Sequence, residues 1–225
     1  MLSSLLLLSS LTAQAGPAHI DAGLYTDFPT SVGARSTFEL DNRVRLSAGV
    51  GMFPDAYLAS IQGVATSAGW YSDSLATLID TALSKAFVAR GQVGYRPWDD
   101  KGFYFNGGYQ RVFALGGEAD GAEVSDGVEG VGEESGYNLV SRLNMVTIEG
   151  GWEWVVKERL VVRTSLGGAF TLSAQTEATE LVDSDAPFER VRAAGREVVE
   201  EYLDTTYTSY VHTPTVGVEV GWRFR

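Results

Sequence analysis

The residues best suited to nucleophilic or acid–base chemistry are the two histidines, His19 and His212, and the hydroxyl groups near them. Ser209 precedes His212 closely, and a serine that meets a histidine can act as a nucleophile. No partner spacing completes a triad with this pair, because Thr213 and Pro214 follow the histidine directly. The sequence therefore predicts no catalytic residue, and a lipid-modifying hydrolase is the least favoured hypothesis.

Metal and cofactor sites are not predicted either. The chain has no cysteine, which excludes thiolate ligands and disulfides. Segment 116–136 is rich in carboxylates and contains no Lys or Arg, so it offers oxygen ligands to divalent cations. These carboxylates lack the ordered spacing of a calcium loop, and a solvated acidic loop is the preferred interpretation. The formal charge of -12 argues against nucleic acid as a partner.

The largest group of chemically active side chains is a set of charges that alternate with apolar residues. In segment 43–53, for example, Val44 and Leu46 share one parity and Arg43 and Arg45 share the other. This period of two is typical of a β-strand whose two faces meet different surroundings. The charged parity comprises Asp21, Asp27, Arg35, Glu39, Arg43, Arg45, Arg90, Arg96, Glu149, Glu153, Arg163, Glu219 and Arg223. Because acids and arginines are nearly balanced, we expect them to pair inside a narrow barrel.

The alternation recurs in eight segments, at about 19–28, 34–40, 43–53, 87–98, 103–115, 139–156, 160–173 and 213–225. Short and longer connections alternate between them, and the three long ones are 54–86, 116–137 and 174–212. Apolar stripes predict helices from about residue 73 in the first of these and over about 185–203 in the last. The predicted fold is an all-β, antiparallel, up-and-down barrel of eight strands with partly helical long loops.

Alternation alone does not say which face points outward, since a soluble lipocalin-like barrel has the same period with the apolar face inside. The aromatic residues favour a membrane barrel. Those near the short-turn ends of the strands are Tyr95, Trp98, Phe103, Trp152, Trp154, Trp222 and Phe224. In membrane proteins aromatic rings are enriched at the level of the lipid headgroups, which they prefer. We therefore predict that the apolar parity faces lipid and that these residues form a membrane-interface girdle.

Residues 1–15 have the features of a secretory signal peptide. They carry no charged side chain, run through Leu5–Leu8 without interruption and end in Ala-Gln-Ala before Gly16. The run is too short to span a membrane as a helix. We expect a cleaved leader, followed by the barrel over residues 16–225.

The whole mature chain resembles the small bacterial outer-membrane β-barrels of the OmpA, OmpX and OmpW kind. The last strand carries the likeness best, with Val216, Val218, Val220, Trp222 and Phe224 on one parity, although Arg225 follows the aromatic that usually ends such chains. The resemblance implies the bacterial outer membrane as location. It also implies the barrel-assembly machinery as a partner, and contact with outer-membrane lipid and lipopolysaccharide.

Architecture does not give activity, so two functional hypotheses remain besides the hydrolase. The first is a non-catalytic barrel that displays acidic, partly helical loops for adhesion, partner binding or envelope integrity. The second is a narrow channel for small hydrophobic molecules, shaped by the apolar faces of the loop helices. Eight strands enclose an interior just wide enough for side chains, which favours display over conduction.

Overall fold

The computed structural model describes residues 18–67, 73–83, 85–98, 102–119, 137–180 and 189–224. The predicted signal peptide, residues 1–15, lies outside the described residues, as does the acidic segment 120–136. None of the described helices is long and apolar enough to cross a membrane.

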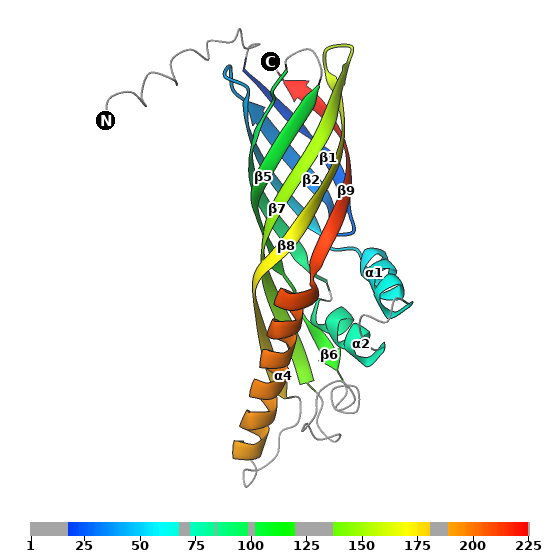
Figure 1. The fold of residues 1–225 in the computed structure, drawn as a ribbon, viewed down its shortest axis with the longest axis vertical. Helices are drawn as coiled ribbons and strands as arrows, with labels where there is room; N and C mark the ends of the chain where they lie inside the picture. Colours follow the sequence, from blue (N-terminus) through cyan, green and yellow to red (C-terminus); the bar gives the residue numbers. More distant parts are fainter. Residues whose placement is uncertain are drawn as a thin grey trace, which may run out of the picture.

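Eight antiparallel strands close into a barrel, which confirms the predicted fold (Figure 1). They are β1 (His19–Phe28), β2 (Ser31–Glu39), β3 (Val44–Met52), β4 (Phe87–Tyr95), β5 (Phe103–Phe113), β7 (Tyr137–Val156), β8 (Leu160–Glu180) and β9 (His212–Phe224). Each strand pairs with its neighbours in chain order, and β1 pairs with β9 to close the ring. The short strand β6 (Gly117–Ala119) pairs with the beginning of β7.

The barrel has an apolar outside and a polar inside. Leu24, Val50 and Leu166 point outward with 72%, 65% and 67% of their surface exposed. Arg45 and Arg163 point inward and are 1% and 2% exposed. The side chains that point into the barrel are therefore those of the charged parity predicted from the sequence, because successive strand residues point to opposite faces.

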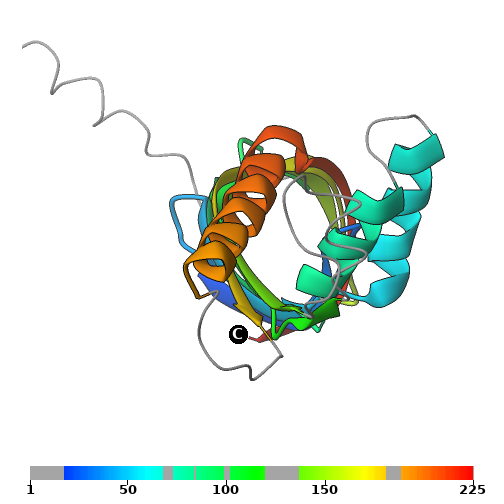
Figure 2. The same ribbon diagram turned by 90° about the horizontal axis from the view of Figure 1, so that it is seen from below.

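The long connections contain the helices α1 (Asp55–Ser67), α2 (Asp73–Ala82) and α4 (Glu189–Tyr210). They gather at the end of the barrel opposite the chain termini, which we call the helical end; the other is the short-turn end (Figure 1). Seen along the barrel from the helical end, α4 lies on one side of the ring of strands, and α1 and α2 lie on the other (Figure 2). The helix predicted from about residue 73 is confirmed.

The predicted long loop at 174–212 is wrong in its bounds. Strand β8 continues to Glu180 instead of ending near Ser173, and α4 continues to Tyr210 instead of ending near Leu203. The extra residues of β8 pair with β7, and Thr176 and Ala178 become buried where α4 covers them. Packing against the helix thus extends a strand whose own residues, rich in Thr and Glu, lack a strong apolar period.

A hydrophobic core fills the helical end. Leu139, Leu143 and Met145 of β7 point inward there and join residues of the helices, including Leu78 and Leu203, in one buried cluster. The interior of the protein is therefore polar over most of the barrel and apolar beneath the helices.

Polar contacts fasten α4 to the free edge of β8. The Glu200 carboxylate accepts a hydrogen bond from the backbone N–H of Ala178 at 2.8 Å. Asp204, one helical turn later, is hydrogen-bonded to Thr176, and burial raises the pKa of its carboxyl. Ser141 donates to the Tyr207 hydroxyl at 3.3 Å, and burial raises the pKa of that phenol. The bonds from the backbone of Ala178 and Thr176 satisfy edge groups of β8 that have no partner strand at this height.

Leu203→Ala should destabilise the docking of α4 by about 2–5 kcal/mol, because Leu203 is fully buried and the shortened side chain leaves a cavity. Hydrogen exchange measured by mass spectrometry should speed up in α4 and in the extended part of β8, with the barrel strands unchanged. Glu201→Ala, an exposed position on the same helix, is the control. Equal exchange in both variants would show that the helix is not held by this core.

Candidate functional site

The charged interior brings together twelve of the thirteen residues predicted to face it. The carboxylates are Asp21, Asp27, Glu39, Glu149, Glu153 and Glu219, and the cations are Arg35, Arg45, Arg90, Arg96, Arg163 and Arg223. Eleven are buried, and Arg223 is half-buried near the short-turn end. Six negative charges meet six positive charges, so this set is electrically neutral.

Glu153 on β7 is the centre of the part of the network nearest the short-turn end. Its carboxylate accepts hydrogen bonds from Arg163 and Arg96, both at 2.7 Å, and from Arg223 at 2.8 Å. Arg45 Nη2 lies 3.4 Å from the same carboxylate. One side chain thus links β7 to β3, β8 and β9 and to the residue that follows β4.

Further ion pairs join strands that are adjacent or two apart in the ring. Arg96, the residue after β4, donates two hydrogen bonds of 2.9 Å to Glu39 on β2. Arg163 on β8 donates to Glu219 on β9 at 2.5 Å and also to Asp21 on β1. Such charge-assisted, partly bidentate bonds fix the relative positions of the strands.

A second group of charges lies closer to the helical end. Asp27 accepts hydrogen bonds from Arg35 at 2.6 Å and from Arg90. Arg90 also donates to the side-chain oxygen of Gln110 at 2.6 and 2.9 Å. Glu149 accepts from Asn106 and lies 3.6 Å from Arg35. Arg35 also lies 3.6 Å from Glu219, so the two groups form one network.

Two tyrosines occupy the interior with the arginines, and the sequence analysis did not select them. The Arg45 guanidinium lies 4.1 Å from the centre of the Tyr104 ring, and Arg35 lies 4.5 Å from that of Tyr25. Gly151 makes room for Tyr104, since a Cβ there would come within 2.5 Å of its ring. Parity was the available signal, because Tyr104 alternates with Phe103 and Phe105 and so points inward.

Among the residues that the structure describes, Arg43 contacts the turn at Pro97 rather than the charged network, which corrects the prediction. It lies just before β3 with a positive φ of 68°. Its guanidinium donates to the backbone oxygen of Pro97 at 3.1 Å. The hairpin at Asp41 and Asn42 has no glycine to take up the left-handed conformation, so Arg43 adopts it and leaves the alternation of the strand.

One cluster of a histidine and two carboxylates has the residue types of a metal site, but an arginine already pairs with both carboxylates. Ligand atoms of His19, Glu39 and Glu153 lie within 4.8 Å of one another. Both carboxylates are already hydrogen-bonded to Arg96, at 2.9 and 2.7 Å, so a divalent cation would have to displace a guanidinium. The residues present do not fit a metal ion. His212 begins β9 at the opposite end of the barrel and packs against Phe170, so the two histidines share no site.

The predicted girdle aromatics gather at the short-turn end. They face outward: Tyr95, Trp98, Trp152, Trp154, Trp222 and Phe224 each expose more than two fifths of their surface, and Phe103 is half-buried. Phe103 contacts Trp98 and Trp152, with ring centres 5.8 and 5.4 Å apart. This places all seven predicted aromatics on the outer surface near one end of the strands.

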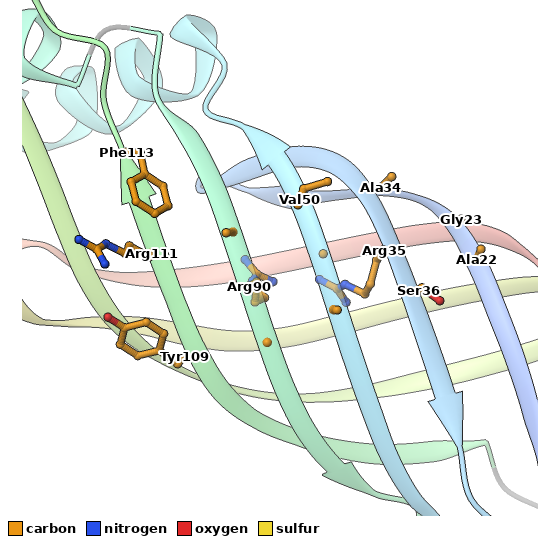
Figure 3. A pocket seen from close by; sticks show the side chains of 14 residues that line it. Ala22, Gly23, Ala34, Arg35, Ser36, Val50, Arg90, Tyr109, Arg111 and Phe113 are labelled. Atoms are coloured by element: carbon orange, nitrogen blue, oxygen red, sulfur yellow. The ribbon is translucent and has the colours of Figure 1, made fainter.

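A shallow groove of about 640 Å³ crosses the outer face of β1 to β5 (Figure 3). Its floor consists of small outward residues, and it is bounded toward the helical end by larger side chains. Its lining residues include Ala34, Ala48, Ala89, Tyr109, Arg111 and Phe113. The sequence analysis did not predict this groove, although it placed Ala48 and Ala89 on the outward parity.

No protein-family model and no curated protein matches the chain. Three solved structures are similar to it. The N-terminal β-barrel domain of Pseudomonas aeruginosa OprF is 12% identical over 94% of this chain and 100% of that one, with a TM-score of 0.45. Acinetobacter baumannii CarO2 is 13% identical over 92% and 98% (TM-score 0.41). Acinetobacter baumannii CarO is 12% identical over 95% and 100% (TM-score 0.40).

Glu153→Ala should lower the free energy of unfolding by about 3–5 kcal/mol, because it leaves several buried arginines without their shared partner. Urea unfolding of the refolded barrel in lipid vesicles measures this change. Glu197→Ala, at an exposed position of α4, should leave the midpoint unchanged. A loss of less than about 1 kcal/mol, the value typical of an exposed pair, would show that the network does not stabilise the barrel.

Proposed function

We propose that this protein is a non-catalytic barrel of the bacterial outer membrane that is closed to solutes and displays a helical lobe outside the cell. The observation that carries the proposal is the inverted polarity of the barrel. Its charged residues are buried inside, and its large apolar residues are exposed outside. A soluble barrel of this kind would expose the polar parity to water instead.

The height of the aromatic residues supports a membrane. The Trp side chains at positions 98, 152, 154 and 222 all lie at the short-turn end, and the outward surface between them and the helical end is apolar. Outer-membrane barrels have short turns on the periplasmic side and long loops outside. The helical end is accordingly the extracellular end in this proposal.

The filled interior supports a closed barrel rather than a channel for small hydrophobic molecules. Long arginine side chains reach between opposite walls, since Arg35 on β2 lies 3.6 Å from Glu149 on β7. Arg45 on β3 also stacks on Tyr104 on β5, two strands away. Beneath the helices, Leu139 and Leu143 continue the filling with apolar side chains. A hydrophobic molecule would have to cross both the apolar core and the charged network.

The lobe formed by α4 and the extensions of β7 and β8 is the part available for display. Glu197 and Glu201 are exposed on α4, and the predicted acidic loop 116–137 joins β5 to β7. A rigid barrel that carries an acidic lobe suits adhesion, partner binding or envelope integrity. In this proposal the barrel-assembly machinery inserts the protein, and outer-membrane lipid and lipopolysaccharide surround it.

The protein should fractionate with the outer membrane and should migrate differently on a gel when unheated and heated, because a folded membrane barrel resists detergent until it is boiled. Fractionation and the gel shift together test the proposed location. Recovery as a soluble periplasmic protein with no heat-dependent shift would contradict it.

The protein reconstituted in a planar bilayer should carry little or no steady ion current, because the interior network blocks a water path. The double variant Arg45→Ala, Tyr104→Ala, which removes the stacked pair, should increase the leak. Arg159→Ala, exposed in the short turn between β7 and β8, is the control. Steady conductance of the unmodified protein, abolished by a bulky residue at Gly167, would establish the channel hypothesis instead.

A further inference from the structure

The groove on the outer face of the barrel combines an apolar floor with a cation at its edge. Ala34, Ala48 and Ala89 form part of the floor, on strands that are otherwise lined by larger outward residues. Arg111 lies at the β5 side of the groove and also points outward (Figure 3). An arginine on a lipid-facing surface is unfavourable unless its charge is satisfied.

The Arg111 guanidinium is incompletely satisfied within the part of the chain that the structure describes. Its Cζ lies 4.9 Å from the centre of the Phe113 ring. Its Nε is shielded from solvent and has no hydrogen-bond partner among the described residues. A group that supplies negative oxygen atoms would complete this environment.

Two further cations surround the same aromatic pair. Phe113 is the register partner of Phe87 on β4 and of Arg142 on β7. Lys85 precedes Phe87 and is exposed. Arg142 pairs with Glu177 at 2.7 Å, which neutralises part of its charge. Arg111 and Arg142 thus lie near Phe113 on one outward surface, and the exposed Lys85 lies two residues before Phe87, in a chain whose formal charge is -12.

The height of this cluster matches a lipid headgroup region. Arg111 lies eight residues along β5 from Phe103, which belongs to the aromatic girdle. At about 3.4 Å per residue and a tilt of about 40°, this separation corresponds to about 21 Å of height. The apolar band of an outer-membrane barrel is about 25 Å tall, so the cations lie close to its outer edge.

We infer that this surface binds a phosphorylated glycolipid of the outer leaflet, of the lipid A type. The phosphates meet Arg111, Lys85 and Arg142, and one acyl chain lies over the small residues of the groove. Cations on both sides of the Phe87–Phe113 pair suit a headgroup with two separated phosphates better than a phospholipid with one. The inference rests on the proposed function, because an outer leaflet is present only if the barrel spans the outer membrane.

Native mass spectrometry of the full-length protein, folded in a non-ionic detergent, tests this site by titration with diphosphorylated lipid A. Lipid A should bind, and phosphatidylglycerol at equal phosphate concentration should not. Arg111→Gln should weaken binding about tenfold, the loss typical of one hydrogen bond to a charged group. Ala48→Leu should also weaken binding by filling the groove, and Arg111→Lys should restore most of it.

Arg159→Gln, an exposed arginine at the short-turn end, is the matched control and should bind lipid A as the unmodified protein does. Each variant is first shown to keep the heat-dependent gel shift, so loss of the fold is separated from loss of binding. Unchanged binding in Arg111→Gln, or equal binding of phosphatidylglycerol, would overturn the inference and leave the membrane location intact. Absence of the gel shift in the unmodified protein would instead overturn the proposed function.

Discussion

The pairing of six carboxylates with six arginines inside the barrel is the interaction on which the rest of the structure depends. Charges in a narrow space that excludes water are tolerated only when each is matched and hydrogen-bonded. Glu153 and Arg163 each contact several partners from different strands, so the network also fixes how the strands lie relative to one another. A barrel filled in this way needs no apolar core at its centre, and its apolar residues remain free to face outward.

Space for the network comes from residues that lack side chains. Gly151 leaves room for Tyr104, and Gly217 leaves room for Asp27, whose Oδ1 would lie 2.3 Å from an added Cβ. Large arginines and tyrosines opposite glycines fill the cross-section of an eight-stranded barrel, which is just wide enough for side chains. These two interior glycines thus follow from the same constraint as the buried charge.

The sequence predicted the strands and most of the interior, because the alternation of side chains between the two faces of a strand depends only on neighbouring residues. It could not predict which charges pair, since Asp21 and Arg163 meet only through the closure of the ring. Arg43 departs from the alternation because its backbone takes the left-handed conformation at the turn before β3. The bounds of β8 depended on burial against α4, which lies later in the chain, and the outer groove depends on residues from five strands.

Strand β7 reverses the polarity of its inward and outward faces along its length. Between Met145 and Val156 its outward residues, such as Ile148 and Trp152, are apolar, and its inward residues, such as Glu149, are charged. Before Met145 the pattern reverses: Leu139 points inward and Arg142 points outward to Glu177. The register with β8 shifts at the same level, between Asn144 and Met145. In the proposed membrane barrel, a strand that leaves lipid for water must exchange its faces in this way, so the reversal places the outer boundary of the membrane at this level.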